Sequence, residues 1–262
     1  MTTKPDPWQA WGPWLGERSS ELKVSIAFST RLRLVHPQPV TGAALGLAVW
    51  ALPIAGVLVG AVGALVYALA HRLGLPAWPA AALTIAATLA ATGCLHEDGL
   101  ADMADGFGGG ATREAKLEIM RDSRIGTYAL CALAMSLLIR TSALASLADP
   151  APVAAALIAA HAGARATMPL LMFFVPPARK DGLSFDAGRP SNERVAAAAI
   201  LGVLILVGSF GLRHAVEAVI LLAIVIALMA RLSRKQIGGQ TGDVAGALEQ
   251  MSEMVILLVA LR

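Results

Sequence analysis

Three aspartates in residues 96–110 have the spacing of a cation-binding face. Asp98, Asp102 and Asp105 stand at positions i, i+4 and i+7, which on a helix places all three carboxylates on one side. Like charges at this spacing repel unless a cation or shared protons lie among them. A divalent metal resolves that repulsion most simply. We therefore predict the three aspartates as metal ligands.

The surroundings of the aspartates favour a site over a solvated helix face. Solvated helices interleave opposite charges, whereas no lysine or arginine stands between Asp98 and Asp105. The glycines from Gly106 to Gly110 predict an open loop after the acids. Mg²⁺ prefers oxygen ligands, keeps waters and shares its shell with substrate phosphates. The pattern therefore predicts phosphoryl transfer with Mg²⁺ as the cofactor.

Residues 113–127 carry mixed charges and predict an amphipathic helix at the membrane interface. Asp122 lies one turn after Glu118, with Arg121 and Arg124 alongside. Two interpretations stay open. Either the arginines bind substrate phosphate and Asp122 adds a metal ligand, or the charges form ion pairs within the helix.

Arg165 stands inside an apolar segment, four residues after His161. A charge within a membrane is costly and usually faces a polar cavity or a partner. We predict that Arg165 binds substrate, with an aspartate of the acid face or an anionic substrate group as its partner; a purely structural ion pair is the alternative.

Residues 238–243 read Gly-Gly-Gln-Thr-Gly-Asp and precede the last apolar segment. Glycine-rich turns before a helix can cradle phosphate on backbone amides. We predict Gly239, Gln240 and Asp243 as substrate-binding residues and Glu253 as a further metal ligand near the same side of the helix. The alternative is that Asp243 only caps this helix.

The composition is that of an integral membrane protein. Of 262 residues, 56% are hydrophobic and 15% are charged, with a mean hydropathy of +0.66. We predict an all-α polytopic fold with about seven spans of about 20 residues each. The expected spans are residues 41–70, 76–95, 127–147, 153–175, 195–212, 215–230 and 243–261. We expect one membrane domain over residues 1–262, including an N-terminal arm (1–40) and an acidic catalytic loop and helix (96–127).

The N-terminal arm carries Trp8, Trp11 and Trp14 at helical spacing. A short helix in the headgroup region and a disordered tail with chance aromatics both agree with this pattern. The arm lacks an apolar core with a cleavage site, so we expect no secretory signal peptide.

Basic residues concentrate in residues 4–33, 113–124, 179–194 and 231–235, which fall on one side of the expected spans. The opposite side has Arg72, Arg140, Arg213 and Arg262. The positive-inside rule then predicts a cell inner-membrane protein whose N-terminus and active site are cytoplasmic. No segment is typical of a nucleic-acid-binding module, which excludes nucleic acid as a partner.

In this order, the motifs resemble the cobalamin synthase family, the adenosylcobinamide-GDP ribazoletransferases. The resemblance covers most of the chain and is most specific in two places: the acid motif from His96 to Asp105 and the Gly-Gly-Gln-Thr-Gly-Asp element. Thr30-Arg31-Leu32, residues 53–60 and 117–126, and Arg165 add to it. Glu97 departs from the family by replacing an apolar residue, and residues 180–190 match only loosely.

The resemblance implies transfer of the phosphoryl-cobinamide group of adenosylcobinamide-GDP to α-ribazole or its 5′-phosphate, with release of GMP. It also implies Mg²⁺ on the motif aspartates and phosphate contacts from Arg121, Arg124 and Arg165. An aspartate or His96 would accept the hydroxyl proton. The partners expected are the two substrates and the lipid bilayer; a homo-oligomer stays open.

Two rival functions are weighed against this resemblance. A CDP-alcohol phosphotransferase usually begins its motif with Asp-Gly-x-x-Ala-Arg, whereas Ala101 is followed here by Asp102. A cation-coupled transporter would bind its ion near the middle of the membrane, whereas the acid face is expected at a cytoplasmic helix end.

Overall fold

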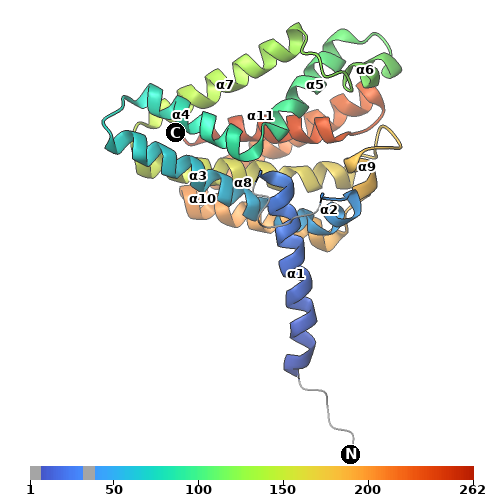
Figure 1. The fold of residues 1–262 in the computed structure, drawn as a ribbon, viewed down its shortest axis with the longest axis horizontal. Helices are drawn as coiled ribbons and strands as arrows, with labels where there is room; N and C mark the ends of the chain where they lie inside the picture. Colours follow the sequence, from blue (N-terminus) through green and yellow to red (C-terminus); the bar gives the residue numbers. More distant parts are fainter. Residues whose placement is uncertain (1–6, 32–38) are drawn as a thin grey trace, which may run out of the picture.

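The computed structural model describes residues 7–31 and 39–262, with side chains from residue 14 onward except for residues 32–38. In these residues the chain forms helices and no named strand, so the all-α prediction is confirmed (Figure 1). The elements are α1 (Pro7–Ser29), α2 (Gly42–Ala48), the 3₁₀ turn η1 (Val49–Ala51), α3 (Leu52–Arg72), α4 (Ala77–Thr92), α5 (Leu95–Gly109), α6 (Arg113–Ile119), α7 (Thr127–Leu147), α8 (Pro150–Phe174), α9 (Leu183–Ala187), α10 (Asn192–Ile237) and α11 (Gly242–Val259).

Four helical segments of the described chain are long and apolar enough to cross a membrane: residues 42–72, α7, α8 and α10. A fifth is added if α4 and α5, which meet at a 91° bend, count as one span. This confirms a multi-pass composition, whereas the predicted number of seven is not confirmed. The last expected span corresponds to α11, which holds Asp243, Glu249 and Glu253 and does not qualify as a separate span.

Helix α10 contains a reversal of the chain. A straight helix of its 46 residues would be about 70 Å long. Yet Arg189, just before α10, lies 4.2 Å over the ring of Phe173, and Arg234 near its end donates to the carbonyl of Phe174. Both ends therefore lie at the same end of α8. The backbone turns at Gly211, whose φ of +74° favours glycine, and this reversal separates the two segments expected at 195–212 and 215–230.

Close packing of α3 on α8 forms the centre of the bundle. A Cβ atom on Gly56 would lie 2.3 Å from the His161 carbonyl oxygen, and one on Gly60 would lie 2.7 Å from that of Leu157. The absence of a side chain at these two glycines therefore lets the backbones of α3 and α8 approach closely. Pro53 lies in the first turn of α3, directly after the 3₁₀ turn η1, where its missing N–H breaks no helical hydrogen bond.

Gly56→Val is expected to lower the melting temperature of the purified protein in detergent, since its side chain would push α3 off α8 at a cost of about 1–3 kcal/mol. Gly208→Ala is the matched control, because a Cβ atom there meets nothing within 4 Å. That control should keep or raise the melting temperature, since alanine favours helix. Equal melting temperatures for wild type and Gly56→Val would contradict the close packing.

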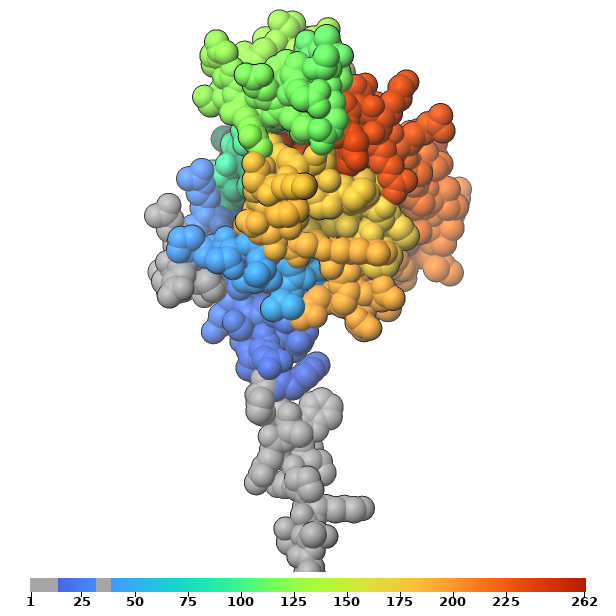
Figure 2. Space-filling model, turned by 90° about the vertical axis from the view of Figure 1, so that its right-hand side faces the viewer, coloured from blue at the N-terminus to red at the C-terminus, as the bar shows by residue number. Residues whose placement is uncertain are grey.

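The basic segments predicted to share one side of the membrane meet at one end of the bundle. Arg113 donates to the carbonyls of Ile237 and Ala178, which joins α6 to α10 and to the segment before α9. At the same end, Arg194 pairs with Glu21 of α1 at 2.7 Å. Figure 2 shows the segments around residues 45, 115 and 185 gathered on this face.

The structure contradicts the expected position of Arg140 and supports a helical N-terminal arm. Arg140 does not lie on the opposite flank; it is buried in the middle of α7. The arm is helical as α1, which supports a helix over a disordered tail. The side chains of Trp8 and Trp11 lie outside the described residues, and Trp14 is exposed.

Candidate active site

The acid motif lies on α5, as the spacing predicted. Gly93 and Cys94 both have positive φ, +67° and +59°, and this pair of residues turns the chain from α4 into α5. On α5, Asp98 is exposed and Asp102 and Asp105 are half-buried. The bend therefore places a row of carboxylates at the surface of a helix that does not continue the direction of α4.

Helix α11 crosses α5 at two glycines. A Cβ atom on Gly99 would lie 2.9 Å from the backbone oxygen of Asp243, and one on Gly246 would lie 3.4 Å from the Cα of Gly99. Glycine is therefore required at position 99 for this approach, whereas a Cβ atom at position 246 would make ordinary van der Waals contact. The crossing brings Asp243, which is distant in sequence, close enough to Asp98 and Asp102 for the carboxylates to repel one another.

The three motif aspartates differ in their partners. Within the described chain, the Asp98 and Asp102 carboxylates have neither an ion pair nor a hydrogen bond. Asp105 instead accepts the backbone N–H groups of Gly126 at 2.6 Å and Ala129 at 2.9 Å, so it caps α7. Asp98 and Asp102 are therefore the carboxylates open to a cation, and Asp105 also holds the start of α7 in place.

The glycines after the aspartates do not form the predicted open loop. Gly106 and Gly108 belong to α5, and they pack on residues that follow: a Cβ atom on Gly106 would lie 2.4 Å from the Met120 side chain, and one on Gly108 would lie 2.6 Å from the Tyr128 ring. These positions require glycine because a larger residue would clash at a helix contact, and not because the loop must be flexible.

Two cavities flank the acid helix. The larger, of about 490 Å³, we call the acid cavity. Its charged lining consists of Glu97, Asp98, Asp102, Asp105, Arg121, Asp122 and Arg124. The smaller, of about 220 Å³, we call the apolar cavity; it lies between α2, α5, α8, α11 and the segment containing α9.

Residues 113–127 do not form one helix, because α6 ends at Ile119 and the following residues form a loop. That loop carries Arg121, Asp122 and Arg124 into the lining of the acid cavity. Arg121 pairs with Asp181 at 2.6 Å, and Arg124 pairs with Asp122. The hydrogen bond from Arg124 lowers the pKa of Asp122 to about 2. The ion pairing weighed for this segment is thus present, although it is not within a helix.

Residues 238–243 pair with a neighbouring segment instead of forming an open cradle. The Gln240 N–H donates to the Pro176 carbonyl at 2.9 Å, and the Ala178 N–H donates to the Gln240 carbonyl at 2.8 Å. A Cβ atom on Gly239 would lie 2.3 Å from the Pro176 oxygen, so glycine is needed for this pairing.

Asp243 is not the N-cap of α11, because Thr241 accepts the Val244 N–H at 3.3 Å in that role. Asp243 lines the apolar cavity, accepts from the Thr241 hydroxyl and lies 3.4 Å from Arg179. Burial raises the pKa of Asp243. The side chain therefore borders the cavity, held by Thr241 and Arg179, and does not cap the helix.

Arg165 lies in a buried ionic network behind the acid helix. Its guanidinium pairs with Glu249 of α11 at 2.7 Å, so its ion-pair partner is not an aspartate of the acid face. The same Glu249 oxygen lies 3.2 Å from Nδ1 of His96. Substrate binding by Arg165 remains a prediction, and the structural ion pair is what its contacts show.

A second part of this network centres on Arg140 of α7. Its guanidinium pairs with Glu97 at 2.8 Å and with Glu253 at 2.9 Å. Glu97, which also lines the acid cavity, is thus paired with a buried arginine. Sequence reasoning named these residues but missed their pairing, for which the signal was the charge itself: acids and an arginine stand within apolar helices, where unpaired charges are costly.

Glu253 does not join the aspartate face, because its side chain is buried beside Arg140 and His161. In the described part of the chain, the one trio of His, Cys, Asp or Glu whose ligand atoms all lie within 4.8 Å is His161, Glu249 and Glu253. Both glutamates already have arginine partners. The trio is therefore better explained as part of the ionic network than as a metal site.

Residues 177–185, for which sequence reasoning assigned no role, form one wall of the apolar cavity. Arg179 contacts Asp243 from this wall, and Ser184 donates to the Gln240 side chain at 2.8 Å. In the sequence, Arg179 looked like a basic membrane flank. Only the folding of this segment over α11 makes it part of the site.

Comparison with known proteins assigns the family. The model of the family described as cobalamin-5-phosphate synthase matches residues 21–261. Adenosylcobinamide-GDP ribazoletransferases of Bradyrhizobium diazoefficiens and Mesorhizobium japonicum are 54% and 52% identical, each over 92% of this chain and over 93% and 92% of their own lengths. The protein of that name from Ralstonia nicotianae is 40% identical over 94% of this chain and 96% of its own length. No solved structure matches the chain. The chain therefore belongs to the cobalamin-5-phosphate synthase family.

Proposed function

We propose that the protein is an adenosylcobinamide-GDP ribazoletransferase. In this reaction a ribazole hydroxyl attacks the phosphorus that carries cobinamide, the P–O bond to the bridging oxygen of the pyrophosphate breaks, and GMP leaves. The product is adenosylcobalamin or, from α-ribazole 5′-phosphate, its phosphate. The observation that carries the proposal is the acid cavity, where Asp98 and Asp102 form no ion pair within the described residues and share the lining with Arg121 and Arg124.

The acid cavity fits Mg²⁺ by the chemistry of its donors. Asp98 and Asp102 offer carboxylate oxygens one turn apart on a solvent-reached face, an arrangement suited to a cation that keeps waters and binds phosphate. We propose these two as ligands, with Asp105 beside them on the same face. When bound, Mg²⁺ would neutralise pyrophosphate charge and stabilise the GMP leaving group.

Arg121 and Arg124 are proposed to bind the pyrophosphate oxygens. Their present partners, Asp181 and Asp122, belong to exposed ion pairs, which contribute little to stability. Exchange of a carboxylate for a phosphate oxygen therefore costs little. The guanidinium geometry also suits two parallel hydrogen bonds to phosphate.

His96 is proposed to take the hydroxyl proton. Its Nδ1 lies 3.2 Å from Glu249 and 3.5 Å from Arg165, and the shorter contact favours an Nδ1–H donated to Glu249. Nε2 then carries the lone pair, and within the described residues it has no hydrogen-bond partner. Glu249 would hold the ring and stabilise its charged form, as carboxylates do for catalytic histidines.

The membrane placement is also a proposal. The basic end of the bundle, with both cavities close to it, would face the cytoplasm of a cell whose inner membrane holds the apolar helices. Charged, water-soluble nucleotide substrates would then reach the acid cavity directly.

The test is turnover by purified protein in liposomes. With adenosylcobinamide-GDP, α-ribazole and Mg²⁺, we expect GMP and adenosylcobalamin in equal amounts, and neither product when Mg²⁺ is chelated. A parallel reaction with a CDP-alcohol and a lipid acceptor should yield nothing. Folded protein that makes CMP in that reaction, and no GMP in the first, would overturn the proposal.

A further inference from the structure

The two cavities beside α5 have different chemistry and share one residue. Among the described residues, Asp98 alone lines both. A transfer reaction between two substrates needs two binding spaces that meet at the reacting atoms. The position of Asp98, a proposed metal ligand, is therefore the expected place of transfer.

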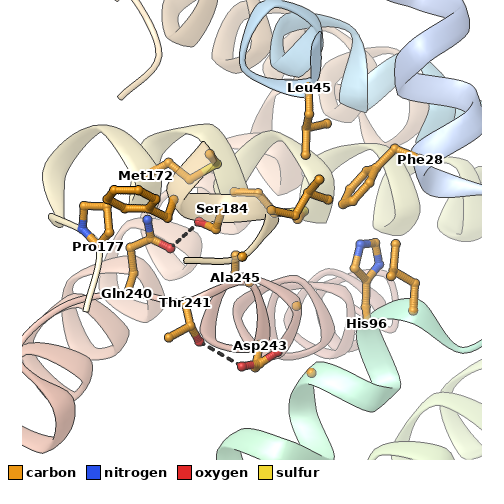
Figure 3. A pocket seen from close by; sticks show the side chains of 18 of the residues that line it. Phe28, Leu45, His96, Met172, Pro177, Ser184, Gln240, Thr241, Asp243 and Ala245 are labelled. Atoms are coloured by element: carbon orange, nitrogen blue, oxygen red, sulfur yellow. Dashed lines mark hydrogen bonds between the residues drawn. The ribbon is translucent and has the colours of Figure 1, made fainter. Parts of the chain in front are cut away.

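The interior of the apolar cavity is formed by large nonpolar side chains from elements far apart in sequence. Phe28 comes from α1, Leu45 from α2, Met168 and Met172 from α8, and Phe185 from α9. Figure 3 shows Leu45 and Phe28 reaching toward the cavity from one side, with His96 and Asp243 bordering it from the other. Such a space favours a flat apolar group, and its thioethers and rings suit contact with an aromatic face.

On the α11 side of this cavity, the Gln240 and Asp243 side chains are engaged by neighbouring groups, whereas on the α5 side Asp98 and the Nε2 of His96 have no hydrogen-bond partner within the described residues. The Gln240 side-chain oxygen accepts from Ser184, and Asp243 contacts both Thr241 and Arg179. A guanine base would bring several edge donors and acceptors that need partners, and leaving them unpaired is costly. A benzimidazole base carries methyl groups and few edge hydrogen-bonding groups, so it fits this lining better.

The corrin ring of the donor substrate is too large for the apolar cavity. The cavity volume of about 220 Å³ is comparable to a small nucleoside and far below that of a corrin ring with its side chains. The corrin must therefore lie outside this cavity.

We propose that the apolar cavity is the acceptor subsite, which holds the dimethylbenzimidazole base of ribazole with its ribose toward Asp98, while the donor pyrophosphate occupies the acid cavity. This inference rests on the proposed ribazoletransferase function. The base would insert among Phe28, Met172 and Phe185, and the attacking hydroxyl would lie beside His96 and Asp98.

The first test fills the cavity. Met172→Trp should raise the KM for α-ribazole at least tenfold and change the KM for adenosylcobinamide-GDP less than twofold. Leu133→Trp is the matched control, since Leu133 lines the acid cavity. It should leave the KM for α-ribazole within twofold of the wild-type value.

The second test enlarges the cavity and does not depend on the bulky variant folding. Met172→Ala should use a riboside with a larger fused-ring base, such as naphthimidazole, with a kcat/KM at least tenfold above that of wild type. If instead Met172→Trp raises only the donor KM, or Met172→Ala gains nothing with the larger base, the subsite assignment is wrong. Wild-type protein that makes no GMP from these substrates would refute the proposed function itself.

Discussion

Asp102→Asn should reduce GMP release by roughly three orders of magnitude while leaving the protein folded. The substitution keeps the shape of the side chain and removes the charge that would hold a divalent cation. Asp102 experiences the negative charges of Asp98, Asp243 and Asp105, and it has no ion-pair partner in the described chain. Loss of one of these like charges relieves repulsion, so the melting temperature should stay the same or rise.

The experiment measures GMP release and thermal unfolding of the same preparations across a Mg²⁺ titration. Glu114→Gln is a suitable control, because it removes one exposed carboxylate from neighbouring α6 outside both cavities. It should keep wild-type turnover. If Asp102→Asn retained more than a tenth of wild-type turnover at every Mg²⁺ concentration, the carboxylate would not be a metal ligand.

Arg140→Gln should have the largest effect on stability, a loss of about 3–5 kcal/mol, because removal of one partner leaves buried charge uncompensated. Arg140 is buried, and its guanidinium contacts Glu97 of α5 and Glu253 of α11. Glutamine can hydrogen-bond one of these glutamates but cannot neutralise either. We expect a markedly lower melting temperature in detergent and little folded protein in membranes.

A double-mutant cycle distinguishes the ion pair from the bulk of the side chain. If the pair matters, Glu97→Gln combined with Arg140→Gln should be less destabilising than the sum of the two single changes. Arg234→Gln, which removes an exposed arginine that donates to the carbonyl of Phe174, is the control and should cost far less. Additive effects of Glu97→Gln and Arg140→Gln would mean that their contact contributes nothing.

Part of the site could be predicted from the types and spacing of residues close together in the sequence. The i, i+4, i+7 spacing placed Asp98, Asp102 and Asp105 on one face of a helix, and α5 confirms that helix. Alternation of basic segments along the chain likewise indicated which loops share an end of the bundle. The first inference depends on helical periodicity, and the second depends on counting the apolar spans between basic segments. Neither needs knowledge of which helices are in contact.

Predictions about conformation between helices were less successful. Glycine can mark a flexible loop or a close helix contact, and the sequence pattern is the same for both. Gly106 was expected in an open loop and Gly239 in a phosphate-binding turn, yet each lets a neighbouring segment approach. Residues 120–126 were expected to continue a helix, and they form the loop that carries Arg121 and Arg124 to the acid cavity.

The family, the all-helical membrane composition and the helix face that bears the acids could be predicted from the amino-acid sequence, because each depends on residue types at short, regular spacings. The partners of the charged residues follow from the folded arrangement of the helices: Glu249 for Arg165, Glu97 and Glu253 for Arg140, and the α7 backbone for Asp105. That arrangement also forms the apolar cavity from α1, α2, α8, α9 and α11. Contacts between helices distant in sequence depend on how close their backbones can approach and on how buried charges pair, and no local spacing encodes either.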